Sequence, residues 1–271
     1  MPASHNRHRE LTAEVAERTS RIVEALDGLD RTALLAPSQL PEWSRLTIAC
    51  HLRYGAEAMA RMTRATVSGR PVAYYPAGRE RQRPLTLVPR PGERPPAVVT
   101  SLEDRGEELD RVWSLLDDAA WGLQVTEPDG NADLGPLELA RLPLLRLTEV
   151  EVHGTDLGLG LDDWGELFVR EALPMRLDRL NTRRSNHPAF GTRPEGTWLL
   201  TAPDGPTYLV GVQAGRVDSR PADPATPATS RLEAKSRDLL ALLLGRPLRG
   251  TLRLSGDTAF GEAFPLAFPG P

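Results

Sequence analysis

The sequence changes character after Arg184, and the change separates two parts of different fold. Up to that residue, apolar positions recur three and four apart, as in helices, between breaks rich in proline. Beyond it they lie in short β-type runs bounded by glycine, proline and aspartate. A length of 271 residues also suggests two domains, at about 150 residues each. We therefore predict an α+β protein with a helical domain over residues 1–185, a smaller α+β domain over 196–271, and a boundary near 185–196.

Five helices are expected in the first part. Ser44 is a suitable N-cap for the second of them, and Gly69 ends it. Pro143 lies inside the fourth and predicts a kink or a late start, because proline lacks the amide donor of a helix interior. The expected helices cover residues 11–29, 44–68, 96–116, 136–154 and 163–180.

The segment from Pro71 to Pro96 is expected to be one long loop, because it is rich in proline and arginine. Loops of this length are uncommon and are often functional. Arg79 and Arg81 are candidate cofactor-binding residues, since a guanidinium group binds a carboxylate through paired hydrogen bonds. The alternative is that the cluster from Arg79 to Arg83 is simply solvated.

The second part is expected to hold four β-type runs and one apolar helix. The helix covers Ser230–Leu244 and ends at Gly245. The runs are GTWLLTA, TYLVGV, GRVDSR and TLRLSG.

Composition excludes several classes of partner. The net charge of −4 is small and both signs are interspersed, which argues against nucleic acid. No apolar run approaches the roughly 20 residues that cross a membrane, and the polar N-terminus lacks a secretory signal. Cys50 is the single cysteine, so no internal disulfide forms, as expected in the cytoplasm. Lys235 is the single lysine, which indicates a genome rich in G and C, as in actinobacteria. We expect a monomer or a homodimer.

Glu149 and His153 are the most suggestive pair of polar residues. They are four apart on an expected helix, so both side chains lie on one face and can approach one ion, whereas Glu151 points elsewhere. His51, within the second expected helix, is the candidate third ligand. The other histidines are less suitable, because His5 and His8 lie in an N-terminus expected to fray and His187 lies in the linker.

Two imidazoles and one carboxylate form the ligand set of many catalytic zinc sites, which leave one position open. Nickel, cobalt or iron also suit such a set. The alternative is that the histidines are hydrogen-bonded core residues.

Three segments carry a resemblance to a known family: PEWSRLTIACHL, YYPAGRERQR and LTEVEVHGTDLGLG. Together with the expected C-terminal domain, they resemble the mycothiol-dependent maleylpyruvate isomerases over nearly the whole chain. The resemblance implies a DinB-like four-helix metal-binding bundle followed by a sterol-carrier-like domain. It places the metal ligands on His51, Glu149 and His153, and it implies the thiol mycothiol as cofactor. It also implies a catalytic arginine, matched here by Arg246 in LLLGRPLR.

In the expected chemistry, a divalent metal activates a low-molecular-weight thiol, and zinc is the first candidate for that metal. A bound cation lowers the thiol pKa from about 8.5, so the thiolate can attack an electrophilic small molecule. We favour an S-transferase or lyase. One alternative is a maleylpyruvate cis–trans isomerase that acts in aromatic-acid breakdown. Another is a non-catalytic metal-binding or regulatory protein. A hydrolase that activates water is a further alternative. Cys50 is expected to be a buried packing residue without a catalytic role. Asp156 is expected either to orient a ligand histidine or to cap its helix.

Overall fold

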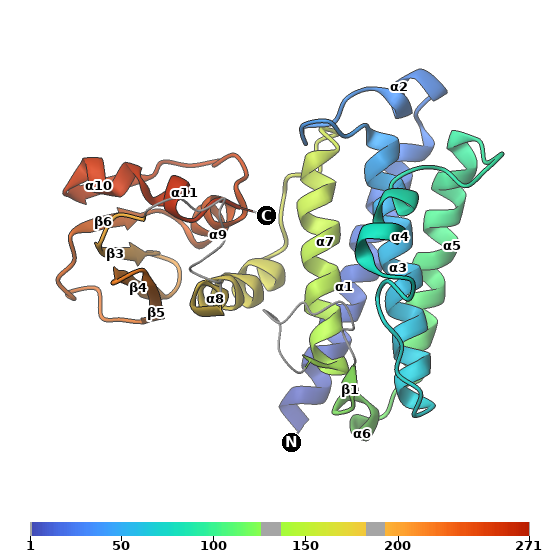
Figure 1. The fold of residues 1–271 in the computed structure, drawn as a ribbon, viewed down its shortest axis with the longest axis horizontal. Helices are drawn as coiled ribbons and strands as arrows, with labels where there is room; N and C mark the ends of the chain where they lie inside the picture. Colours follow the sequence, from blue (N-terminus) through green and yellow to red (C-terminus); the bar gives the residue numbers. More distant parts are fainter. Residues whose placement is uncertain (1, 126–136, 183–192, 271) are drawn as a thin grey trace. The chain divides into compact units, whose positions relative to one another are not determined.

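A computed structural model describes residues 2–125, 137–182 and 193–270, and its contacts divide the chain into two compact units. Unit 1 spans Met1–Phe168 and unit 2 spans Val169–Pro271. The expected fold class is confirmed, because helices come first and a sheet with further helices follows (Figure 1). The boundary expected near residues 185–196 falls largely outside the described residues, so those limits stay a prediction.

Unit 1 is a bundle of four long helices that lie side by side (Figure 1). These are α1 (Pro2–Asp27), α3 (Arg45–Val67), α5 (Pro95–Ser114) and α7 (Leu142–Asp156). Helix α3 packs against α5 and α7, and α1 packs against the same two helices. The shorter elements of the unit are α2 (Arg31–Leu35), α4 (Arg79–Thr86), α6 (Asp118–Trp121), β1 (Gln124–Val125), β2 (Leu137–Glu138) and η1 (Leu139–Arg141). None of the described helices is long and apolar enough to cross a membrane.

Local signals in the sequence determine where the helices of the site begin. Ser44 caps α3, and its side chain accepts a hydrogen bond from the amide of Thr47. Helix α7 starts late, with Pro143 in its first turn, where a missing amide donor costs nothing. The prediction of a helix from residue 136 is therefore wrong for residues 137–141, which form β2 and η1. Pro136 itself lies outside the described residues.

The segment between α3 and α5 is not a structureless loop. It contains α4 (Arg79–Thr86), so the expectation of one long loop from Pro71 to Pro96 is wrong. Gly78 precedes the helix with a φ of 88°, a conformation that favours glycine. Residues 79–83 are good helix formers, and the prolines that suggested a loop lie mainly outside this stretch.

The apolar stripes of the four helices meet in a common core. Fully or almost fully buried positions recur at helical spacing on every helix, as expected for faces that point inward. Examples are Ile22, Leu26, Ile48, Leu52, Leu102, Leu109, Leu147 and Val150.

A buried ion pair joins two helices of this core. Arg18 of α1 lies 2.9 Å from Glu151 of α7, and both side chains are almost entirely buried. Arg18 also binds Asp163 and the backbone oxygen of Leu161, just after α7. Glu151 therefore faces α1, as its spacing from His153 predicted.

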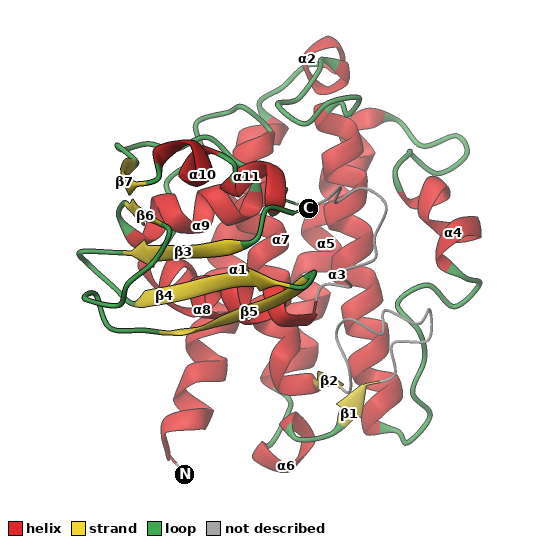
Figure 2. Cartoon of the chain, turned by 60° about the vertical axis from the view of Figure 1, so that its left-hand side comes forward, coloured by secondary structure: helices red, strands yellow, loops and turns green. Residues whose placement is uncertain are grey.

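Unit 2 contains a five-stranded sheet with the strand order β5-β4-β3-β6-β7 (Figure 2). Strands β3 and β6 are parallel, and the other neighbours are antiparallel. Its elements are α8 (Glu166–Thr182), β3 (Gly196–Thr201), β4 (Thr207–Gln213), β5 (Arg216–Pro221), β6 (Ser230–Glu233), α9 (Ser236–Leu244), β7 (Arg253–Gly256), α10 (Thr258–Glu262) and α11 (Phe264–Ala267). The core of the unit centres on Trp198 of β3, whose ring is stacked on that of Phe260 at 4.2 Å.

The helix expected over Ser230–Leu244 is correct only from Ser236 onward. Residues Ser230–Glu233 form β6 instead, because they pair with both β3 and β7. The expected end is confirmed, since Gly245 follows α9 with a φ of 66°.

We predict that Glu151→Ala lowers the free energy of unfolding by about 1–3 kcal/mol, because it removes the nearer of the two carboxylates beside the buried guanidinium group of Arg18, which keeps Asp163. Urea unfolding followed by circular dichroism measures the change. The matched control is Arg90→Ala, which removes a half-exposed partner of Glu57 and should cost no more than about 1 kcal/mol. Equal losses in the two variants would contradict the prediction.

Candidate metal centre

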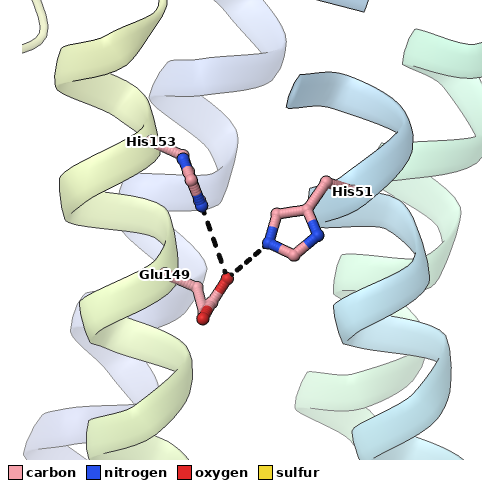
Figure 3. Close-up of side chains that lie close together, drawn as sticks. All are labelled: His51, Glu149 and His153. Atoms are coloured by element: carbon pink, nitrogen blue, oxygen red, sulfur yellow. Dashed lines mark hydrogen bonds and ion pairs between the residues drawn. The ribbon is translucent and has the colours of Figure 1, made fainter. Parts of the chain in front are cut away.

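Helices α3 and α7 bring the three predicted metal ligands together. His51 comes from α3, and Glu149 and His153 come from successive turns of α7 (Figure 3). The two helices are antiparallel, because the segment that enters α3 is bound to the end of α7. The amide of Gln39 donates to the Asp156 oxygen at 2.8 Å, and Arg45 Nε donates to the Leu157 oxygen at 3.0 Å.

The side chains of the trio converge on the Glu149 carboxylate. Its Oε2 lies 2.7 Å from His51 Nε2 and 3.7 Å from His153 Nε2 (Figure 3). One ligand atom from each residue lies within 4.8 Å of the others. In the part of the chain that the structure describes, this is the one group of three or more histidine, cysteine or acidic residues able to share a metal ion.

The charge states of His51 and Glu149 suit a cation. Burial lowers the pKa of His51, and nearby Glu149 offsets only part of this effect, so the ring is neutral at pH 7. Burial by itself would raise the pKa of Glu149. The neighbouring His51 and His153 outweigh that effect, with a smaller contribution from Arg146, and hold the pKa at about 2. Neutral imidazole and ionised carboxylate are the forms that bind metals.

Asp156 contacts His153, as the first of the two roles expected for this aspartate requires. Its Oδ2 lies 2.9 Å from His153 Nδ1, and the carboxylate is almost fully buried. A carboxylate on one ring nitrogen leaves the other nitrogen, Nε2, directed at Glu149 (Figure 3).

Trp43 forms an aromatic wall against the trio. Its ring is stacked on His153 at a centroid distance of 5.9 Å and meets the edge of His51 at 5.4 Å. The guanidinium of Arg83, in α4, lies 5.8 Å from the centre of the Trp43 ring. Neither residue is assigned to the site from the sequence, where Arg83 is considered only as a member of the cluster from Arg79 to Arg83. Only packing between distant segments reveals them.

The predicted arginines take different positions. Arg79 is exposed at the start of α4, with its guanidinium 5.8 Å from the centre of the Tyr75 ring. Arg81 is exposed on the same helix. Arg246 lies in unit 2, where its Nη1 donates to the Leu244 oxygen at 2.7 Å. A role in binding or catalysis stays a prediction for all three.

The remaining candidates lie away from the trio. His8 is not in a frayed end, because it lies within α1 and its ring is stacked on Trp121 at 4.9 Å. The side chain of His5, and the whole of His187, lie outside the described residues. Cys50, beside His51 in the chain, is fully buried, and burial raises the pKa of its thiol to about 11.

These features define a class of protein: a four-helix bundle that presents two histidines and a glutamate across two antiparallel helices, followed by an α+β unit. Residues 9–158 match the family described as the mycothiol maleylpyruvate isomerase N-terminal domain, and the chain belongs to that family. The matched region contains the whole trio. The resemblance seen in the sequence is therefore confirmed.

Two solved structures share the fold. A crystal structure of a mycothiol-dependent maleylpyruvate isomerase aligns with a TM-score of 0.66 at 18% identity over 92% of each chain. The crystal structure of a histidine-to-alanine mutant of such an isomerase aligns with a TM-score of 0.65 at 17% identity, again over 92% of each chain. No curated protein matches the chain significantly.

We predict that Cys50 is inert in the folded protein. A thiol reagent such as Ellman's reagent attacks through the thiolate, and a pKa of about 11 leaves little thiolate at pH 8. The native thiol should react at least about 100-fold more slowly than the thiol of the urea-unfolded chain. Cys50→Ala provides the blank, because no other cysteine is present. Rapid stoichiometric reaction of the native protein would contradict this prediction.

Proposed function

We propose that this protein is a divalent-metal-dependent enzyme that uses the low-molecular-weight thiol mycothiol to act on an electrophilic small molecule. The observation that carries the proposal is the convergence of His51, Glu149 and His153 within the residues matched to the family. Its expected location is the cytoplasm, where the single thiol of the chain stays reduced.

The donor set fits a divalent metal. His51, Glu149 and His153 would hold it, with two nitrogens and one oxygen, as in catalytic zinc sites. The Asp156 carboxylate lies 2.9 Å from His153 Nδ1 and supplies the outer contact that ligand histidines usually have. A bound cation of this kind lowers the pKa of a thiol brought to it, so that the thiolate predominates at neutral pH.

The surrounding residues of this chain have separate tasks. Trp43 covers one side of the two imidazoles and excludes water from them. Arg83, held against that ring, and Arg79, one turn before it, offer guanidinium groups to anionic parts of a thiol or substrate. Cys50 cannot supply the nucleophile, because it is fully buried with a raised pKa. An external thiol is therefore required.

Two reactions fit this arrangement. In a transferase, the thiol adds to an electron-poor carbon of the substrate and the adduct leaves. In an isomerase, the thiol adds to a cis double bond, the new single bond rotates, and the thiol departs. The family description supports the second reaction, maleylpyruvate isomerisation. We favour the broader S-transferase assignment, because an activated thiolate can attack many kinds of electron-poor carbon.

We predict about one divalent metal ion per chain. His51→Ala and Glu149→Ala should each lose most of it, since two ligands rarely retain a metal that three hold. Asp156→Asn should bind metal roughly 10- to 100-fold more weakly, because it loses the acceptor that orients His153. Elemental analysis and competition with a chelator measure both effects. His8→Ala is the matched control and should keep full metal content; undiminished metal in both ligand variants would refute the site.

We predict that turnover requires added mycothiol and saturates with its concentration. Purified protein is assayed against maleylpyruvate and a panel of other electrophiles, with and without the thiol. Cobalt-substituted protein should develop a sulfur-to-metal absorption band when mycothiol is added. Full turnover without thiol, with solvent oxygen in the product, would instead favour a hydrolase. Metal binding without turnover of any compound would favour the non-catalytic alternative.

A further inference from the structure

Arg146 is a buried cation that makes no side-chain hydrogen bond within the described residues. The residue lies in α7, one turn before Glu149, and is 1% exposed. All three nitrogens of its guanidinium group lack a hydrogen-bond partner within the described parts of the chain. A guanidinium group carries five N–H donors and keeps its charge in proteins, so burial without acceptors is costly.

Two other buried arginines of the same bundle show how unusual this is. Arg53, 3% exposed, places Nη1 2.8 Å and 2.7 Å from the two carboxylate oxygens of Glu93. Arg18, 2% exposed, pairs with Glu151 at 2.9 Å. The fold therefore supplies a carboxylate wherever it buries these two arginines, and Arg146 differs from them in having none within ion-pair distance among the residues described.

Gly55 leaves space where the guanidinium group lies. A methyl group on this glycine would lie 2.8 Å from Arg146 Nη1 and 3.2 Å from the Tyr74 hydroxyl oxygen, so two polar groups converge above its Cα. Glycine weakens a helix interior, and Gly55 lies in the middle of α3. Its presence there is explained by the close approach of Arg146 and Tyr74.

The converging groups lie directly next to the metal trio. Gly55 is one turn after His51 in α3, and Arg146 is one turn before Glu149 in the antiparallel α7. The Glu149 side chain is 38% exposed, whereas Arg146 is 1% exposed, so the guanidinium group is more deeply buried than the carboxylate. Tyr74 lies between α3 and α4, in a stretch of the chain without regular secondary structure.

We propose that Arg146 and Tyr74 form a carboxylate-binding subsite one helical turn from the candidate metal ligands. The proposal rests on the proposed function, and it assigns the substrate a carboxylate group close to its reacting carbon. A bound carboxylate would accept paired hydrogen bonds from the guanidinium group and one from the Tyr74 hydroxyl. Burial raises the pKa of Tyr74, which keeps this hydroxyl a donor.

The experiment measures binding of maleate, a small dicarboxylate, to metal-loaded protein by isothermal titration calorimetry at constant ionic strength. Metal content is determined on the same samples, so that failure of the metal site is seen separately. Arg146→Met keeps the length of the side chain without its charge and should weaken maleate binding by about tenfold or more with unchanged metal content. Arg146→Lys should restore part of the affinity. Arg141→Met, which removes an exposed arginine just before α7, is the control and should bind like the unaltered protein.

Two variants that retain Arg146 keep the test valid if Arg146→Met does not fold. Gly55→Ala should displace the guanidinium group and weaken maleate binding, whereas Gly28→Ala, with open space at its Cβ, should not. Tyr74→Phe should weaken binding by a smaller factor. Unaltered affinity in Arg146→Met or in Gly55→Ala, or no maleate binding by unaltered protein with full metal content, would overturn the subsite and leave the metal centre intact. Maleate binding with absent metal would support the subsite and count against the proposed function.

Discussion

The antiparallel contact between α3 and α7 is the constraint on which the site depends. Hydrogen bonds from Gln39 and Arg45 to the end of α7 hold the start of α3 in place and set the register of the two helices. In that register, His51 of α3 faces Glu149 of α7. One turn further along, Gly55 of α3 faces Arg146 of α7. A shift of one residue along either helix would rotate its ligands by about 100° and separate them. The packing of the bundle core therefore determines, through this register, which side chains meet at the candidate site.

Charge in the interior of unit 1 is arranged in pairs. Arg18 and Arg53 each have a carboxylate, and each pair joins segments that are distant in sequence. The candidate metal centre departs from this arrangement, because the ionised Glu149 contacts a neutral His51, and Arg146 has no hydrogen-bonded anion among the described residues. Buried charges without partners are costly, and stable folds keep them mainly where a function requires them. Both the carboxylate and the guanidinium group are thus prepared for partners of opposite charge.

Sequence reasoning succeeded where the controlling interactions are local. Ser44 and Pro143 predicted helix starts because caps and missing amide donors act within one turn. The spacing of Glu149 and His153 predicted a shared face for the same reason. It failed where a distant partner decides, as at Ser230, where pairing with β3 and β7 overrides the helical pattern. Helix α4 was missed because the prolines around it concealed a short run of good helix formers.

The sequence alone therefore determined the fold class, the four long helices and the pair of candidate ligands on α7, since periodicity and capping depend on neighbours in the chain. Tertiary structure alone decided which atoms meet. The contact of His51 with Glu149 joins residues 98 apart at 2.7 Å, and the same packing places Trp43 against both imidazoles. It also buries Arg146 beside Gly55, without an acceptor. Such contacts depend on the register and rotation of packed helices, which are set by the whole core rather than by any local pattern.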